Sequence, residues 1–172
     1  MRSVLQRVLR QDKPFPSIEA EVFVALQVAA HRALDPWARF LRQHAGLTPN
    51  QYNVLRILRG ASPAGLTCGQ IGERMITRDP DVTRLTDRLV RAGLAQRARS
   101  DGDRRVVEVS ITPSGLEVLS RLDHTAPANV IGNLGPDQLR ALRDLLAEVI
   151  LATTDGAEPD EPASPPNTIK PS

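Results

Sequence analysis

The chain has 172 residues, of which 41% are hydrophobic and 3% aromatic, and its formal net charge is +2 at pH 7. This length predicts one domain or little more, and the shortage of aromatic residues argues against base-stacking platforms for single-stranded nucleic acid. The single cysteine, Cys68, excludes a disulfide framework or a thiolate metal cluster within one chain.

Nothing in the sequence predicts secretion, membrane insertion or catalysis. Arg2, Arg7 and Arg10 interrupt the apolar residues at the N-terminus, unlike a secretory signal, and no run reaches the about 18 apolar residues of a transmembrane helix. The histidines lack the spacing of a metal site, and no nucleophile–base pair or phosphate-binding loop is evident. We therefore expect a cytoplasmic protein that is not an enzyme and needs no cofactor.

Positive charge is concentrated in the middle of the chain. Residues 155–172 contain four acids and one lysine, so the net charge of the other 154 residues is +5. Twenty of the 22 basic residues are arginine, which suits bidentate contact with phosphate and guanine, although a genomic codon bias would produce the same excess. Nine arginines lie between residues 74 and 105, which makes this stretch the candidate site.

The N-terminal part of the chain predicts a helix after a short lead. Residues 1–16 allow one or two helical turns, and Ser17 is the expected N-cap of an apolar-periodic segment that continues to Ala45. Asp35-Pro36 leaves two alternatives, a kink in one helix or a second helix capped by Asp35.

Three further helix starts follow. Thr48 to Gln51 and Thr67 to Gln70 are capping boxes, which predict helices to Gly60 and to about Ile76. Asp79 is the expected cap of the next helix, with Pro80 at its first position. Spacing at 100° per residue places one group of that helix inward: Val82, Leu85, Thr86 and Leu89. The outward group is Pro80, Arg84, Asp87 and Arg91, flanked by Thr83 and Arg88.

A β-hairpin is expected next. Residues 95–99 form one strand candidate, Asp101-Gly102 a tight turn, and residues 105–111 a second strand with Val107, Val109 and Ile111 on one face. Helices are predicted from Pro113 and from Pro136, before a disordered tail. A short helix, a turn, a helix with a polar outer face and then a hairpin indicate a mainly α (α+β) winged helix-turn-helix.

At this point the sequence resembles the MarR (multiple antibiotic resistance regulator) family of winged helix-turn-helix transcription factors. The resemblance spans roughly residues 17–152. The motifs that carry it are Leu47-Thr48-Pro49-Asn50-Gln51-Tyr52, the helix Asp81–Leu94, the wing Ser100–Arg105 and the segment Val109–Gly115.

The resemblance implies a homodimer that binds an operator and is released by a small ligand or an oxidant. It implies dimerisation regions at residues 17–45 and 113–152, a DNA-binding domain at residues 46–112, a lead at 1–16 and a tail at 153–172. The residues expected at the DNA are Pro80, Asp81, Thr83, Arg84, Asp87, Arg88, Arg91, Asp103, Arg104 and Arg105.

Individual roles follow from position. Arg84 and Thr83 lie near the start of the helix and are expected at base edges, with phosphate contact as the alternative for Thr83. Arg88 and Arg91 are expected at phosphates or at intramolecular acids. Arg104 is the candidate for the minor groove or a phosphate.

Several roles stay open from the sequence. Arg105 either contacts DNA or braces Asp87 or Asp103, and Asp81 has no assigned role. Cys68, in the first turn of a helix, is either an oxidant sensor or a small core residue.

Two assignments beyond the DNA-binding residues also stay open. Trp37 and Tyr52 either line a ligand crevice or pack in the core. At the level of function, the alternative to an operator-binding repressor is a winged-helix module that docks another protein.

Overall fold

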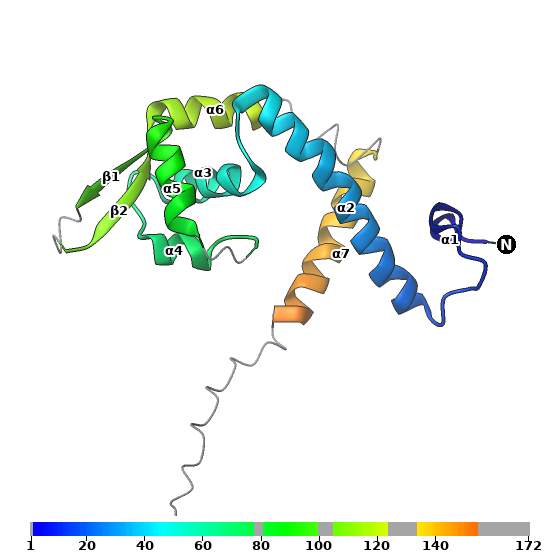
Figure 1. Ribbon diagram of the computed structural model, residues 1–172. Helices are drawn as coiled ribbons and strands as arrows, with labels where there is room; N and C mark the ends of the chain where they lie inside the picture. The colour runs from blue at the N-terminus through cyan, green and yellow to red at the C-terminus, as the bar shows by residue number, and fades with distance from the viewer. Residues whose placement is uncertain (1, 78–80, 100–104, 124–133, 155–172) are drawn as a thin grey trace, which may run out of the picture. The chain divides into compact units, whose positions relative to one another are not determined.

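The computed structural model describes residues 2–77, 81–99, 105–123 and 134–154 of the chain. Its elements are α1 (Val4–Leu9), α2 (Ile18–Ala45), α3 (Pro49–Ala61), α4 (Cys68–Glu73), α5 (Val82–Arg91), β1 (Ala95–Arg99), β2 (Val107–Ile111), α6 (Pro113–Asp123) and α7 (Pro136–Thr154) (Figure 1). They fall into two compact units, Met1–Gly132 and Asn133–Ser172. This architecture confirms the predicted mainly helical winged helix-turn-helix.

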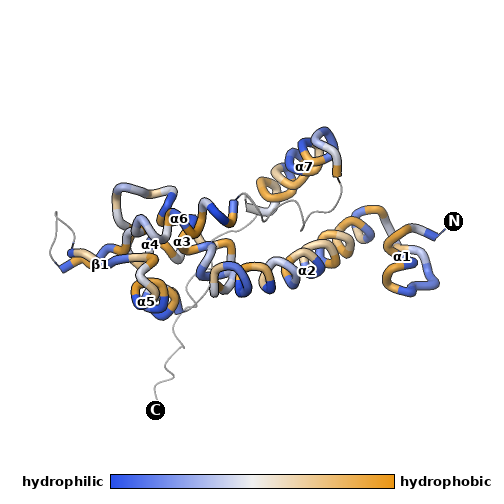
Figure 2. The backbone as a smooth tube through the Cα atoms, turned by 90° about the horizontal axis from the view of Figure 1, so that it is seen from above, coloured by the Kyte–Doolittle hydropathy of each residue, from blue (hydrophilic) through white to orange (hydrophobic). Residues whose placement is uncertain are grey.

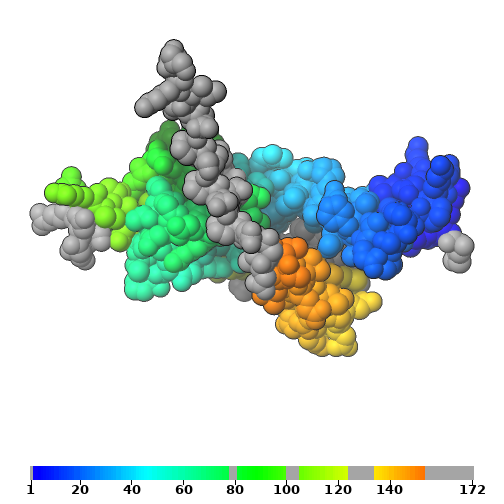
Figure 3. All heavy atoms as spheres, turned by 90° about the horizontal axis from the view of Figure 1, so that it is seen from below, coloured from blue at the N-terminus to red at the C-terminus, as the bar shows by residue number. Residues whose placement is uncertain are grey.

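The hairpin is a two-stranded antiparallel sheet in which Ala95 pairs with Ile111 and Arg99 with Val107. Leu66, between α3 and α4, adds an isolated antiparallel bridge to β2, because its backbone exchanges two hydrogen bonds of 2.9 and 2.8 Å with Val109. The hairpin extends beyond the neighbouring helices as a wing (Figures 1 and 3).

The core of the first unit is aliphatic, as the composition predicts. Its fully buried side chains come from α2, α3, α4, α5, β2 and α6. They include Leu41, Val54, Leu55, Leu58, Ile71, Leu89, Val109 and Leu119. Trp37, Phe40 and Tyr52 pack against this cluster, with the Trp37 ring edge-on to the Tyr52 ring at 5.0 Å.

α2 resolves the alternatives at Asp35-Pro36, because one helix runs from Ile18 to Ala45 with Pro36 inside it. Ser17 caps it as predicted, since its hydroxyl accepts from the backbone N–H of Ala20. Gly46 ends it at φ 66°, in the left-handed region that glycine adopts without a steric cost.

α4 and β2 have boundaries that differ from the sequence predictions. α4 ends at Glu73 rather than near Ile76, although Met75 still packs against the core. β2 begins at Val107, whose side chain is 49% exposed, so only Val109 and Ile111 of the predicted face are buried. Val107 is not among the side chains that pack against the core.

Thr112, just before α6, forms hydrogen bonds with the residues that follow α5. The Thr112 hydroxyl donates to the Gly93 carbonyl at 2.7 Å, and the Thr112 N–H donates to the Leu94 carbonyl at 3.1 Å. Gly115 lies directly against this junction, where a Cβ would collide with the Leu94 carbonyl and with Ile111. The entry into α6 is therefore fixed against α5 and the wing.

α7, described by itself, is a helix of 19 residues that contains both hydrophobic and hydrophilic residues along its length (Figure 2). Leu145, Ile150 and Leu151 are each more than 60% exposed. Among the described residues, no helix is long and apolar enough to cross a membrane.

Candidate nucleic-acid interface

α4 is fixed by a complete capping box. The backbone N–H of Gln70 donates to the Thr67 hydroxyl at 3.2 Å, and the Thr67 N–H donates to the Gln70 side chain at 3.0 Å. Ile71 anchors this short helix in the core. α4 packs on α5, and this pair is the helix-turn-helix.

α5 begins two residues later than the sequence predicts. Its N-cap is Asp81, whose carboxylate accepts from the backbone N–H of Arg84 at 3.2 Å, and its first helical residue is Val82. The prediction that Asp79 caps this helix and that Pro80 opens it is therefore wrong. Two aspartates two residues apart are equally good N-caps by residue type, so the sequence did not distinguish them.

The two faces of α5 are as predicted. Leu85, Thr86 and Leu89 are buried, and Val82 packs against the core. The exposed residues of the outer face are Thr83, Arg84, Arg88 and Arg91. The helix therefore presents three guanidinium groups to solvent within three turns.

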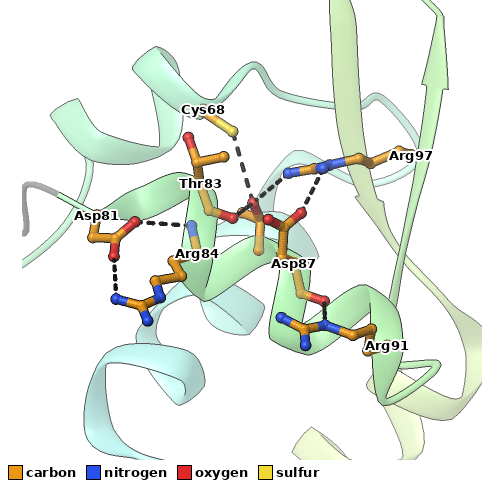
Figure 4. Close-up of polar contacts among 8 residues, drawn as sticks. Cys68, Asp81, Thr83, Arg84, Asp87, Arg91 and Arg97 are labelled. Carbon is orange, nitrogen blue, oxygen red and sulfur yellow. Dashed lines mark hydrogen bonds and ion pairs between the residues drawn. The ribbon is translucent and has the colours of Figure 1, made fainter.

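Asp87 is the acidic residue of this outer face, and it is paired. Its carboxylate lies 2.6 Å from Nη1 of Arg97, which projects from β1 (Figure 4). Arg97 also donates from Nη2 to the Thr86 hydroxyl at 3.0 Å. The Asp87 backbone carbonyl accepts from Nε of Arg91 at 3.3 Å.

Arg97 was not among the residues predicted from the sequence to form the site, although its position in β1 carried a signal. Arg97 lies two residues after the buried Ala95, so strand alternation places both side chains on one face. Its cross-strand partner is Val109, which is fully buried, and directly paired residues share a face. Arg97 is nevertheless not buried, since its side chain is 33% exposed, and it pairs with Asp87.

The remaining predicted residues divide into two groups. Arg105 is exposed two residues before β2, at the end of the hairpin where Arg99 pairs with Val107. Pro80, Asp103 and Arg104 lie outside the described residues, as do Asp79 and the predicted turn at Asp101-Gly102.

Cys68 contacts the same network. Its Sγ lies 3.7 Å from the Thr86 hydroxyl, and its side chain is half-buried against the core.

The curated relatives of the chain are transcription regulators. The model for the MarR family matches residues 45–106. The HTH-type transcriptional regulator TtmR of Methylorubrum extorquens (strain PA1) is 33% identical over 150 residues, which cover 86% of this chain and 74% of that protein. MhqR of Bacillus subtilis is 28% identical over 134 residues, covering 75% of this chain and 89% of that regulator.

Solved structures share the fold. A MarR transcription factor from Planctomyces limnophilus matches with a TM-score of 0.56 and 33% identity, covering 84% of this chain and 100% of that one. Sco3205 of Streptomyces coelicolor, a MarR family regulator solved in complex with DNA, matches with a TM-score of 0.66 and 24% identity, over 87% of this chain and 94% of that one.

The fold and the α4–α5 pair with its wing define a winged helix-turn-helix protein. The chain belongs to the MarR family of helix-turn-helix transcription regulators, and like its relatives it is a regulator and not an enzyme.

Proposed function

We propose that the protein is a cytoplasmic, sequence-specific repressor that binds a palindromic operator as a homodimer and is released by a small ligand. The observation that carries this proposal is the outer face of α5, where Arg84, Arg88 and Arg91 are exposed beside a wing. An α-helix fits the major groove of DNA, and a residue near the helix start reaches the base edges. Sco3205, a neighbour of the same fold, was solved in complex with DNA.

Base contacts are assigned to the start of α5. Arg84 and Thr83 lie in its first turn, and both side chains are exposed. The guanidinium of Arg84 suits the two acceptors of guanine in the major groove. Thr83 serves a base edge or a phosphate.

Phosphate contacts are assigned to the rest of this face and to the wing. Arg88 and Arg91 lie one and two turns beyond Arg84, where the helix runs toward the backbone of the duplex. Arg104 and Arg105 are proposed for the flanking minor groove or its phosphates. The proposed interface also includes Pro80, Asp81, Asp87 and Asp103. Asp81 acts through capping and Asp87 through pairing rather than on the DNA.

Dimerisation is assigned to the regions that flank the DNA-binding domain, residues 17–45 and 113–152. Apolar side chains exposed on α7, such as Leu145 and Val149, would be covered by a second copy. A two-fold dimer places two α5 helices about 34–36 Å apart, in successive major grooves on one side of the duplex.

The experiment that tests DNA recognition is selection of bound duplexes from a random pool by the full-length protein. Enrichment of a palindrome whose half-sites lie about 10 base pairs apart supports the proposal. Recovery of no consensus, with no retention on heparin, favours the alternative of a protein-docking module.

Dimerisation is tested separately by sedimentation of the full-length protein. Leu145→Asp places a charge among the exposed apolar side chains of α7, and we expect it to shift the protein toward the monomer. Ala147→Asp is the control, since it adds the same charge two residues along, on a different side of the helix. Equal sedimentation of the two variants would remove α7 from the interface.

A further inference from the structure

One guanidinium connects the wing to the recognition helix α5. Arg97, in the middle of β1, places Nη1 2.6 Å from the Asp87 carboxylate and donates from Nη2 to the Thr86 hydroxyl at 3.0 Å (Figure 4). Asp87 and Thr86 are consecutive residues of α5. The two nitrogens of a rigid, planar group are therefore held by two points of one helix.

Thr86, which accepts from the Arg97 guanidinium, lies in the core. Thr86 is fully buried, and its hydroxyl donates to the Thr83 carbonyl at 2.8 Å. Because a hydroxyl has one proton, Thr86 accepts from Arg97, and the Cys68 thiol at 3.7 Å is the donor in that contact. The position of the guanidinium is thus defined relative to α4 as well as α5.

This arrangement has two consequences for a helix that faces DNA. The Asp87 carboxylate, 39% exposed on the arginine-bearing face, is neutralised within the chain instead of repelling phosphates. The two-point contact also restricts rotation of β1 relative to α5. A lysine at position 97 would keep the charge but offers no planar fork for both acceptors.

We infer that Arg97 is a positioning residue, which sets the angle of the wing to α5 so that both reach the same duplex, and that it makes no DNA contact itself. This inference rests on the proposed function. The competing roles of Arg97 are a direct phosphate contact and a contribution to folding stability alone.

Three variants of the full-length protein distinguish these roles, with a duplex obtained by selection on the wild type. Arg97→Ala and Arg97→Lys should both lose protection of the flanking nucleotides in a hydroxyl-radical footprint while keeping the central protection. Affinity should fall on the order of tenfold, the scale of one lost charge-assisted contact. Asp87→Ala should give the same footprint, although it removes an acid from the DNA-facing side.

The results that overturn the inference are specific. A direct phosphate contact predicts that Arg97→Lys retains most of the affinity and that Asp87→Ala tightens binding. A role in stability alone predicts lower melting temperatures with unchanged footprints and affinities below the transition. If Arg97→Ala does not fold, Arg97→Lys and Asp87→Ala carry the test.

A double-mutant comparison then asks whether Arg97 acts through the wing. The wing variant replaces Arg104 and Arg105 by alanine. Adding Arg97→Lys to it should weaken binding by less than twofold, because the wing contacts are already lost. Additive losses, or a wing variant that binds like the wild type, overturn the inference. Wild-type protein that binds no selected duplex removes the proposed function as well, so the two failures are distinguishable.

Discussion

The Asp81 carboxylate makes two contacts with Arg84, to its backbone N–H at 3.2 Å and to its guanidinium at 3.5 Å. The first contact caps α5, and the second holds the side chain that we assign to the base edges. Asp81, which the sequence left unexplained, therefore has a structural role at the start of the helix that we propose to face DNA.

The capping role of Asp81 predicts different effects for its two simplest substitutions. Asp81→Ala should lower the free energy of unfolding by about 1 kcal/mol, because one N–H at the start of α5 loses its acceptor. Asp81→Asn keeps a capping oxygen and should stay within about 0.5 kcal/mol of the wild type. Urea denaturation measures both. If Asp81→Ala were as stable as Asp81→Asn, the cap would lie elsewhere.

The proposed base contact of Arg84 predicts a change in specificity. Arg84→Ala should cost about 1–3 kcal/mol of binding to the selected duplex and relax the preference at one base position of each half-site. Arg91→Ala, on the same face, should weaken binding to all sequences alike and reduce the salt slope by about 1. Anisotropy titrations on single-base variants of the duplex compare the two. A uniform loss for Arg84→Ala would reassign it to a phosphate.

The packing at Gly115 predicts opposite effects for two glycine-to-alanine substitutions. Gly115→Ala places a methyl group against the Leu94 carbonyl and Ile111, so we expect it to destabilise the fold by about 1–3 kcal/mol. Gly60→Ala, near the end of α3, meets no atom within 4 Å and should leave stability unchanged or raise it by up to about 1 kcal/mol. Thermal unfolding of both proteins tests the pair. Similar melting temperatures would contradict the close approach of α6 to the α5–wing junction.

Tyr52 predicts a loss of stability at alkaline pH. Burial raises the pKa of its phenol, Arg56 and Arg59 oppose that shift, and Asp123 adds to it. The folded protein therefore holds the phenolic proton more tightly than the unfolded chain. The resulting stabilisation is complete below the unfolded pKa of about 10 and is lost as the pH rises through the folded pKa.

The measurement is direct because Tyr52 is the only tyrosine in the chain. Its phenolate absorbance should titrate at a higher pH in the folded protein than in denaturant. Tyr52→Phe should lack the alkaline loss of stability. A midpoint at or below the denatured value would contradict the burial of the phenol beside Trp37.

Local patterns were sufficient to predict much of the fold. The capping boxes at Thr48 and Thr67 are satisfied within four consecutive residues, so their sequence alone specifies the helix starts, and both are confirmed. The inner face of α5 is confirmed for the same reason, since helical spacing fixes which residues turn inward.

Some features depend on a choice between two residues that could serve equally well, or on contacts between elements. The sequence predicted these features less well. Asp79 and Asp81 are both suitable caps by residue type, and the structure uses Asp81. The Arg97–Asp87 pair joins residues ten positions apart in two different elements, so no local spacing identifies it. The one local indication was strand alternation, which places Arg97 on the same face of β1 as the buried Ala95.

We propose that exposed arginines on α5 and the wing bind duplex DNA with sequence specificity. The most direct measurement is the affinity of the full-length protein for a selected duplex and for its scrambled control, each across a series of salt concentrations. We predict binding at least about 10³-fold tighter to the selected duplex at physiological salt, with log K falling steeply as log salt rises. Equal affinities for the two duplexes, or binding that does not respond to salt, would contradict the claim.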